Sequence, residues 1–243
     1  MYLFFIRHGQ SANNALYDRT GESRGRSEDP ELTETGKQQA LLLADFIART
    51  DIAARNGDHP ADLALRRDYF GFTHLYTSLM VRSIATGLPV AGTSGLPLNG
   101  WIDIHETGGI FLDDEVTGEP HGLPGRTRSY FQERFADLVL PDDVSETGWW
   151  NRPFERREQR DARAAKVLSE LLERHGGTDD RVAMVSHGAF YNHLMRAIFG
   201  TKDQRIWFVM NNTGISRVNF HEDGQANLIY HNRTDHLPDE MLT

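Results

Sequence analysis

Short apolar runs that end directly in a polar, glycine-containing loop occur at two distant places in this chain. Residues 2–6 (YLFFI) precede Arg7 and His8, and residues 182–185 (VAMV) come shortly before His187. Continuous apolar runs of this length, rich in β-branched or aromatic side chains, are typical of strands buried on both faces of a sheet. Because ligands of open α/β sheets bind outside the carboxyl ends of the strands, we predict that both histidines reach a ligand crevice.

Helical and strand periodicities alternate along most of the sequence and predict an α/β fold. Apolar residues at helical spacing, with cap and stop signals, predict helices over residues 33–50, 80–88, 153–175 and 188–199. Further strands are predicted over residues 74–77, 206–209, 215–220 and 226–230, with looser alternation over 96–104. We expect the last two to pair across the turn at residues 221–224.

Three segments lack clear periodicity. Residues 13–30 are predicted to form a surface loop, whose three arginines either guide an anion toward the first histidine or are simply solvated: Arg19, Arg24 and Arg26. Residues 50–72 contain turn signals and are interpreted as an embellishment. Residues 107–152 are rich in Gly, Pro and Asp, and we predict a lid-like insertion in a single domain spanning residues 1–243. The alternatives for that insertion are a dimer contact or surface decoration.

Composition and charge narrow the classes of partner. The chain has 243 residues, a formal net charge of -9 and no cysteine. The acidic balance argues against nucleic acid or an anionic membrane as partner, and the lack of cysteine excludes disulfides and thiolate metal sites. No apolar run approaches the roughly 18 residues needed to span a bilayer, and Arg7 follows the first run too closely for a signal peptide. We therefore expect a cytoplasmic protein whose folded domain begins at Met1.

Five side chains at predicted strand ends and helix starts suit a phosphoryl group. A neutral imidazole is a good nucleophile, and His8 could carry a covalent phosphohistidine. Arg7 and Arg82 could bind the phosphoryl oxygens with their planar guanidinium groups, with His187 beside them. Glu106 could give a proton to the leaving alcohol and later activate water. With this cationic set and no carboxylate cluster beside it, we expect no metal and no cofactor.

Six short motifs, taken in order, resemble those of a known family. They are RHGQSANN, LTETGKQQA, SLMVRSIAT, HETGG, VSHG and NNTGIS, spread from Arg7 to Ile215. Together they resemble the histidine phosphatase superfamily, which includes the cofactor-dependent phosphoglycerate mutases. The resemblance implies a three-layer α/β/α sandwich with a mostly parallel central sheet.

The resemblance also implies roles for individual residues. His8 matches the phosphorylated histidine, and Arg7 and Arg82 match the phosphate-binding arginines. His187 matches the second pocket histidine, and Glu106 matches the acid/base. Three more residues match polar or small positions of the same motifs, with a role in substrate binding: Asn14, Ser11 and Gly188.

The sequence favours a metal-independent phosphomonoester hydrolase acting on a small phosphorylated molecule. A phosphoglycerate mutase is an alternative, but the FxGWxD segment and the later arginine pair of such mutases are not visible. A phospholigand-binding protein with weak or no turnover is a second alternative. A zinc hydrolase is a third, although the 11 histidines lack HxxEH or HExxH spacing. The irregular segments supply surface for a homodimer.

Other conspicuous aromatic and imidazole side chains are predicted to be structural. We expect His105 to be a polar residue at a strand end and His193 to be a satisfied histidine on a helix face. Phe190 and Tyr191 are predicted to lie in the core. The tandem tryptophans of the insertion are expected to pack within it rather than bind a leaving group: Trp149 and Trp150.

Overall fold

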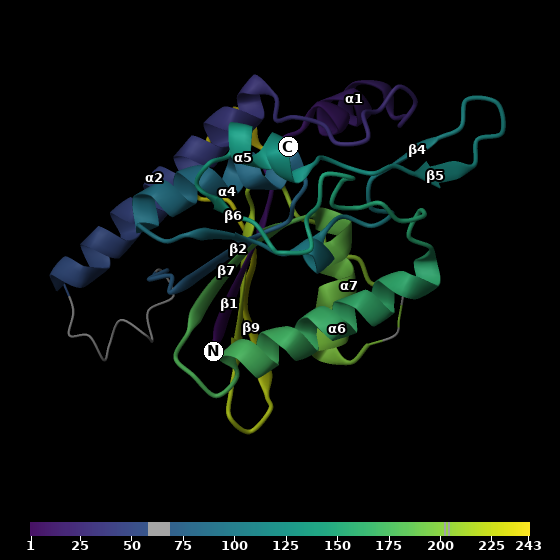
Figure 1. The fold of residues 1–243 in the computed structure, drawn as a ribbon. Helices are drawn as coiled ribbons and strands as arrows, with labels where there is room; N and C mark the ends of the chain where they lie inside the picture. The colour runs from purple at the N-terminus through teal and green to yellow at the C-terminus, as the bar shows by residue number, and fades with distance from the viewer. Residues whose placement is uncertain (58–68, 202, 204) are drawn as a thin grey trace.

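A seven-stranded sheet forms the centre of the molecule (Figure 1). The computed structural model describes residues 1–57, 69–201, 203 and 205–243. The strands of the sheet are β1 (Tyr2–Arg7), β2 (His74–Thr77), β3 (Leu98–Gly100), β6 (Leu138–Val139), β7 (Arg181–Ser186), β8 (Ile215–Phe220) and β9 (Ala226–Arg233). Their order is β6-β3-β2-β7-β1-β8-β9; β8 runs antiparallel to both β1 and β9, and the other neighbouring strands pair parallel.

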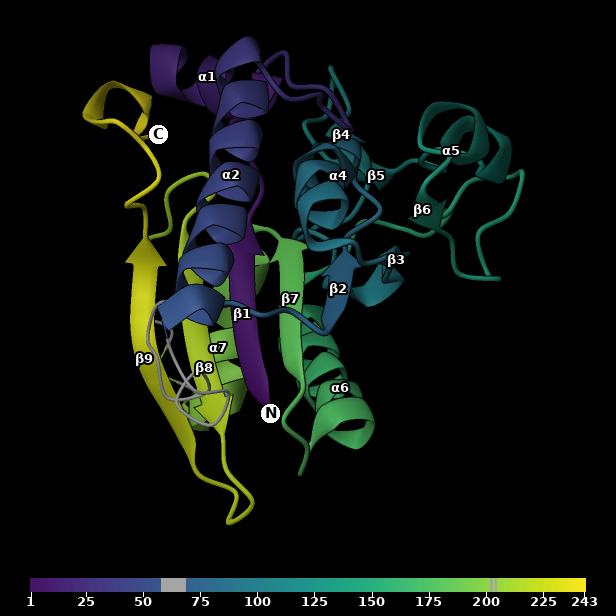
Figure 2. The same ribbon diagram turned by 90° about the vertical axis from the view of Figure 1, so that its left-hand side faces the viewer.

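Helices cover both faces of this sheet. Helices α2 (Glu34–Gly57) and α4 (Val81–Ser94) pack together on one face, and α6 (Arg157–His175) and α7 (Gly188–Phe199) pack together on the other. Figure 2 shows the first pair in front of the strands and the second pair behind them. The predicted three-layer α/β/α architecture with a mostly parallel sheet is therefore confirmed. No described helix has the length and apolar character needed to cross a membrane.

The alternating side chains of β1 supply both halves of the core. Phe4 and Ile6 belong to the hydrophobic cluster that packs against α2 and α4, whereas Leu3 and Phe5 belong to the cluster beneath α6 and α7. Successive side chains of a strand point to opposite faces, so a strand covered on both sides must be apolar at every position. This explains the continuous apolar run over residues 2–6.

Strand register brings the carboxyl ends of three parallel strands together. Arg7 of β1 lies opposite Ser186 of β7, and Thr77 of β2 lies opposite Val185. The residues that follow these strands therefore meet at one edge of the sheet. The crevice predicted from the two apolar runs has its structural basis in this register.

The strand predicted over residues 206–209 is wrong, because this segment has no regular secondary structure. The amide of Asn192 on α7 uses both backbone groups of Phe208: Oδ1 accepts from its N–H at 2.6 Å, and Nδ2 donates to its carbonyl at 3.0 Å. Arg7 Nη1 donates to the Met210 carbonyl at 2.5 Å. These side chains use backbone groups that a strand would need for pairing in a sheet. The segment therefore packs against α7 and does not form a strand.

Other elements differ from the predictions mainly at their boundaries. Residues 13–30 begin within a helix, α1 (Ala12–Thr20), and the loose alternation over 96–104 yields only β3 and the 3-10 turn η1 (Ile102–Ile104). Helix α2 continues past residue 50 to Gly57, and residues 58–68 of the predicted embellishment lie outside the described residues.

The segment 107–152 is partly integrated into the main core. It contains a hairpin of β4 (Phe111–Asp113) and β5 (Pro120–Gly122) that extends away from the sheet (Figure 1), then α5 (Arg128–Arg134), then β6 at the sheet edge. Trp149 and Trp150 are buried in the same hydrophobic cluster as Phe4, so they pack as predicted and do not line a ligand pocket. A lid function for this segment stays a prediction.

Candidate active site

A pocket of about 440 Å³ opens at the carboxyl ends of β1 and β7. His187 is fully buried beside this pocket, and its ring centroid lies 5.1 Å from that of His8. The other residues singled out from the sequence all line the pocket: Arg7, His8, Ser11, Asn14, Arg82, Glu106 and Gly188. The structure thus brings all eight together, although they come from four distant parts of the chain.

His8 is held in one orientation and kept neutral. Its Nδ1 lies 2.7 Å from the carbonyl oxygen of Gly9, and its Nε2 accepts a hydrogen bond from Arg82 Nε at 3.1 Å. A proton on Nδ1 satisfies both contacts and leaves the lone pair on Nε2. Burial holds the pKa of His8 well below its usual value, and the charges of Arg82 and Arg7 lower it further. At neutral pH the imidazole is therefore an uncharged base with a directed lone pair.

His187 begins helix α7 as its N-cap residue. Its Nε2 lies 2.9 Å from Ser78 Oγ and 3.3 Å from Ser83 Oγ, whereas Nδ1 is buried and has no hydrogen-bond partner among the described residues. Burial also holds the pKa of His187 well below its usual value, and Arg82 and His8 lower it further. A buried polar atom without a partner is costly, which sets Nδ1 of His187 apart from the other buried imidazole nitrogens next to the pocket.

The two arginines reach the pocket in different ways. Arg82, in the first turn of α4, is almost fully buried, and its Nη1 lies 3.8 Å from Oδ1 of the buried Asp29. Arg7 Nε is buried without a hydrogen-bond partner among the described residues. Gly188 lies next to it, since a Cβ atom built on this glycine would be 3.5 Å from Arg7 Nε. Burial lowers the pKa of both arginines, but an arginine stays charged at neutral pH. Two guanidinium groups thus concentrate positive charge beside His8.

Glu106 is fixed by the amino terminus of helix α7. Its Oε1 accepts from the N–H groups of Phe190 at 2.9 Å and Thr107 at 2.8 Å, and its Oε2 accepts from that of Ala189 at 3.2 Å. Free N–H groups at a helix start bind anions, and the helix dipole favours them. The carboxyl group is therefore positioned at the pocket wall by backbone rather than by flexible side chains.

Ser11 and Asn14 have a clear structural task. Ser11 is the N-cap of α1, and Asn14 Oδ1 accepts from the Ser11 N–H at 3.1 Å and from its hydroxyl at 3.0 Å. Asn212 joins this pair, because its Nδ2 donates to the His8 carbonyl at 2.8 Å and lies 3.3 Å from Asn14 Oδ1. This network fixes the loop after β1, and the predicted contact of Ser11 and Asn14 with substrate stays a prediction.

Sequence reasoning missed the outer wall of the pocket. This wall includes Tyr17, Trp207 and Val209, whose exposed fractions are 60%, 58% and 65%. Arg26 lines the pocket too, and its guanidinium carbon lies 4.1 Å from the ring centroid of Phe111. Among residues 107–152, all of which are described, none lines the pocket. The apolar run near residue 207 is a usable signal for this wall, although its pattern favours a strand.

The residues expected to be structural are so. Phe190 and Tyr191 are fully buried in the cluster beneath α6 and α7. His193 is buried on α7, with Nδ1 2.6 Å from Asp161 Oδ1, and His105 is buried with Nδ1 2.8 Å from the Glu106 carbonyl. None of these four side chains lines the pocket.

Comparison with known proteins settles the family. A family model described as histidine phosphatase superfamily (branch 1) matches residues 3–55 and 61–233. This chain belongs to that superfamily. The family assignment makes it an enzyme of the phosphatase type, as the sequence motifs predict. No curated protein matches the sequence.

Solved structures of related phosphatases share the fold. Phosphoserine phosphatase from Entamoeba histolytica, in complex with 3-phosphoglyceric acid, is 20% identical over 98% of this chain and 99% of that chain, with a TM-score of 0.58. A mycobacterial glucosyl-3-phosphoglycerate phosphatase in complex with VO3 is 16% identical over 96% and 99%, with a TM-score of 0.57. Bacillus stearothermophilus YhfR is 20% identical over 97% and 98%, with a TM-score of 0.56.

Proposed function

We propose that the protein hydrolyses a small phosphomonoester through a phosphohistidine formed at Nε2 of His8. The observation that carries this proposal is the state of His8: it is neutral, and its Nδ1 is tied to its own loop. The lone pair of Nε2 lies against Arg82, beside the position that an anionic phosphoryl group would occupy. Because the imidazole is already neutral, no proton has to be removed from it before attack.

The first half-reaction transfers the phosphoryl group to the enzyme. Arg82 Nε–H turns from His8 Nε2 to a phosphoryl oxygen, and the freed Nε2 lone pair forms a bond to phosphorus while the bond from phosphorus to the ester oxygen breaks. Glu106 acts as the acid and gives a proton to the departing alkoxide, so the alcohol leaves neutral, and the three backbone N–H groups stabilise the carboxylate that results. Arg7 and Arg82 stabilise the charge on the equatorial oxygens, and the free Nδ1 of His187 is a further hydrogen-bonding group close to His8.

The second half-reaction regenerates the enzyme. A water molecule attacks phosphorus, Glu106 as carboxylate takes one of its protons, and the bond between phosphorus and Nε2 breaks. Inorganic phosphate leaves, His8 is neutral again, and Glu106 holds the proton needed for the next cycle. The backbone N–H groups of α7 keep the carboxyl group in place for both steps.

The outer wall favours a phosphatase with a bulky, partly apolar leaving group. Tyr17, Trp207 and Val209 are exposed at the pocket, and such surface is stabilised when an apolar ligand covers it. The pocket of about 440 Å³ beside His8 has room for water as well as for a leaving group. This supports hydrolysis over a mutase reaction, which has to keep water away from the phosphohistidine.

Trapping the intermediate tests this function. Rapid acid-free quenching of the enzyme with a phosphorus-labelled aryl phosphate should leave label on the protein that is stable to alkali and labile to acid, as expected of phosphohistidine. The label should map to His8 and should be absent from His8→Ala. Normal turnover of the aryl phosphate by His8→Ala, or label on a different residue, would overturn the proposed mechanism.

A further inference from the structure

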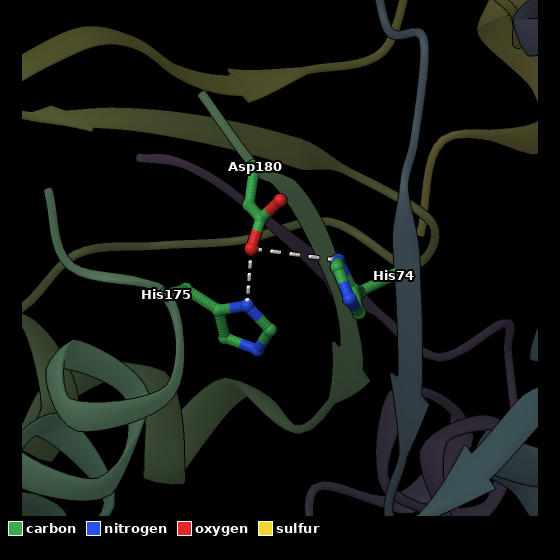
Figure 3. A group of neighbouring side chains, drawn as sticks. All are labelled: His74, His175 and Asp180. Atoms are coloured by element: carbon green, nitrogen blue, oxygen red, sulfur yellow. Dashed lines mark hydrogen bonds and ion pairs between the residues drawn. The ribbon is translucent and has the colours of Figure 1, made fainter. Parts of the chain in front are cut away.

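A second cluster of histidine and carboxylate side chains lies at the opposite end of the sheet from His8. Figure 3 shows His74, His175 and Asp180 facing one another. His74 begins β2, His175 ends α6, and Asp180 immediately precedes β7. The amino ends of β2 and β7 are far from the carboxyl ends that form the pocket, so the phosphatase chemistry does not account for this cluster.

The donor atoms of the three side chains converge. Asp180 Oδ2 lies 2.8 Å from His175 Nδ1 and 3.9 Å from His74 Nδ1, and one donor atom from each residue lies within 4.8 Å of the others. In a tetrahedral site with metal bonds of about 2.0–2.1 Å, the donor atoms lie about 3.3 Å apart. The two separations from Asp180 fall on either side of that spacing and the donor atoms of the two imidazoles lie within 4.8 Å of each other, so side-chain rotations that draw the imidazoles together complete a site.

A tyrosine supports the buried imidazole from behind. Tyr76 Oη lies 3.1 Å from His175 Nε2, on the ring edge away from Asp180. A histidine that binds a metal through one nitrogen commonly donates its other N–H to an oxygen, which fixes the tautomer and the ring orientation. In the structure, His175 Nδ1 donates to Asp180 Oδ2 at 2.8 Å and Nε2 accepts from the Tyr76 hydroxyl. A metal ion at Nδ1 takes the place of that proton, and the proton moves to Nε2, which then donates to Tyr76 Oη.

The cluster is also reachable from solvent. The side chains of His74 and Asp180 are 39% and 27% exposed, whereas that of His175 is 4% exposed. Thr73 Oγ1 lies 2.9 Å from His74 Nδ1 and is the hydrogen-bond partner that a metal ion would replace. The buried His175 has a fixed orientation, and the partly exposed His74 and Asp180 leave a path by which a metal ion can enter.

We propose that His74, His175 and Asp180 bind one Zn²⁺ ion, with water in the fourth position. Two imidazoles and one carboxylate form a ligand set that zinc accepts, and imidazole favours it over calcium or magnesium. The ion joins β2, the end of α6 and the start of β7, so its effect is on stability. The site does not depend on the function proposed for His8.

Zinc titration of the chelator-treated protein tests the site. Calorimetry should find one saturable Zn²⁺ site per chain, and thermal unfolding should show a Tm rise on the order of 5 °C at a zinc concentration 100-fold above Kd. His74→Ala and Asp180→Asn should each weaken binding more than about 100-fold. The exposed His121 provides a matched control, and His121→Ala should bind as the unchanged protein does.

Two further variants separate zinc binding at this cluster from binding at the phosphatase pocket. His8→Ala removes the pocket imidazole and should leave zinc affinity unchanged. Tyr76→Phe keeps the ring but removes its hydroxyl, and it should weaken zinc binding about 10-fold. Absence of a saturable 1:1 site would overturn the proposal. Equal zinc affinity in the unchanged protein, His74→Ala and Asp180→Asn would also overturn it.

Discussion

The two histidines at the carboxyl ends of β1 and β7 come from nearly the same local sequence but have different surroundings. His8 ties Nδ1 to its own loop and turns Nε2 toward Arg82 at the pocket, whereas His187 ties Nε2 to two serines and leaves Nδ1 free. Both are neutral because burial outweighs any gain from protonation. The comparison teaches that partners from helix α4 and the loop before it, rather than the strand-histidine-glycine pattern, decide which histidine can act as nucleophile.

The largest expected effect comes from removing the nucleophile. His8→Ala should lower kcat for a generic aryl phosphate by about 10⁴-fold or more, because His8 is the only histidine among the described residues that line the pocket. Steady-state assays, with circular dichroism as the folding control, measure this loss. A decrease in kcat of less than about 10-fold would contradict the assignment of His8, rather than His187, as the nucleophile.

Removing the second histidine should have a smaller effect. His187→Ala should lower kcat by about 10²- to 10³-fold, which is typical when one group that stabilises the transition state is lost. Unlike His8→Ala, this variant should still accumulate a phosphoenzyme, although more slowly. Quench-flow labelling of both variants makes the contrast direct, and a complete lack of label in His187→Ala would contradict it.

The buried carboxylate behind Arg82 should shape the acid side of the pH profile. Burial raises the pKa of Asp29 to about 6, and its protonation removes the negative charge that faces Arg82. His8, with its pKa well below 6.5, stays neutral there, so kcat/KM should fall below pH 6 because of Asp29 rather than the nucleophile. The sign follows because Arg82 keeps its ionised partner only above this pKa.

Asp29→Asn separates this effect from titration of the substrate. We expect the variant to lose about 10-fold in kcat/KM at about pH 7.5 and to have a flatter profile between about pH 5 and 7. A phosphomonoester also titrates near pH 6, and that contribution should remain in the variant. Identical profiles for the variant and the unchanged protein would show that Asp29 does not control Arg82.

The smallest effect concerns the exposed outer wall of the pocket, away from His8. Trp207→Ala should raise KM about 3- to 10-fold for a bulky aryl phosphate and leave KM for a short alkyl phosphate nearly unchanged, because only the bulky group reaches the wall. A panel of phosphomonoesters at matched concentrations measures this selectivity. The exposed Val116, outside the pocket, provides the control Val116→Ala. Equal changes for both esters would place the leaving group elsewhere.

The parts of the fold that can be predicted from sequence are those with a local cause. A strand covered on both faces must be apolar throughout, so β1 and β7 can be located from their apolar runs, and a strand end that bears a histidine points to the ligand crevice. The segment over residues 206–209 has an equally apolar run, but Asn192 takes its backbone hydrogen bonds. No pattern within the segment indicates that partner.

The site shows the same division between local and distant causes. Arg7 and His8 are identifiable because they come directly after an apolar run that forms a strand, and the remaining assignments rest on family motifs. Asp29 pairs with Arg82 across more than fifty residues, and Arg26 rests on a phenylalanine of the β4 strand. Asp29 and Arg26 both lie in the charged segment 13–30, and the composition of such a segment predicts solvent-exposed side chains. Only the folded structure distinguishes the charged side chains that contribute to the site from those that are simply solvated.

Helix α7 has a consequence for how such an enzyme can change its substrate. Its first turn carries His187 and holds Glu106, and one turn later Asn192 grips the backbone of Phe208 in the outer wall. Helix α7 therefore positions both the reactive groups His187 and Glu106 and the outer wall of the pocket, so any tilt of this helix displaces both. A change of substrate is more readily achieved by substitutions at positions 207 and 209. These leave the hydrogen bonds between Asn192 and the Phe208 backbone intact.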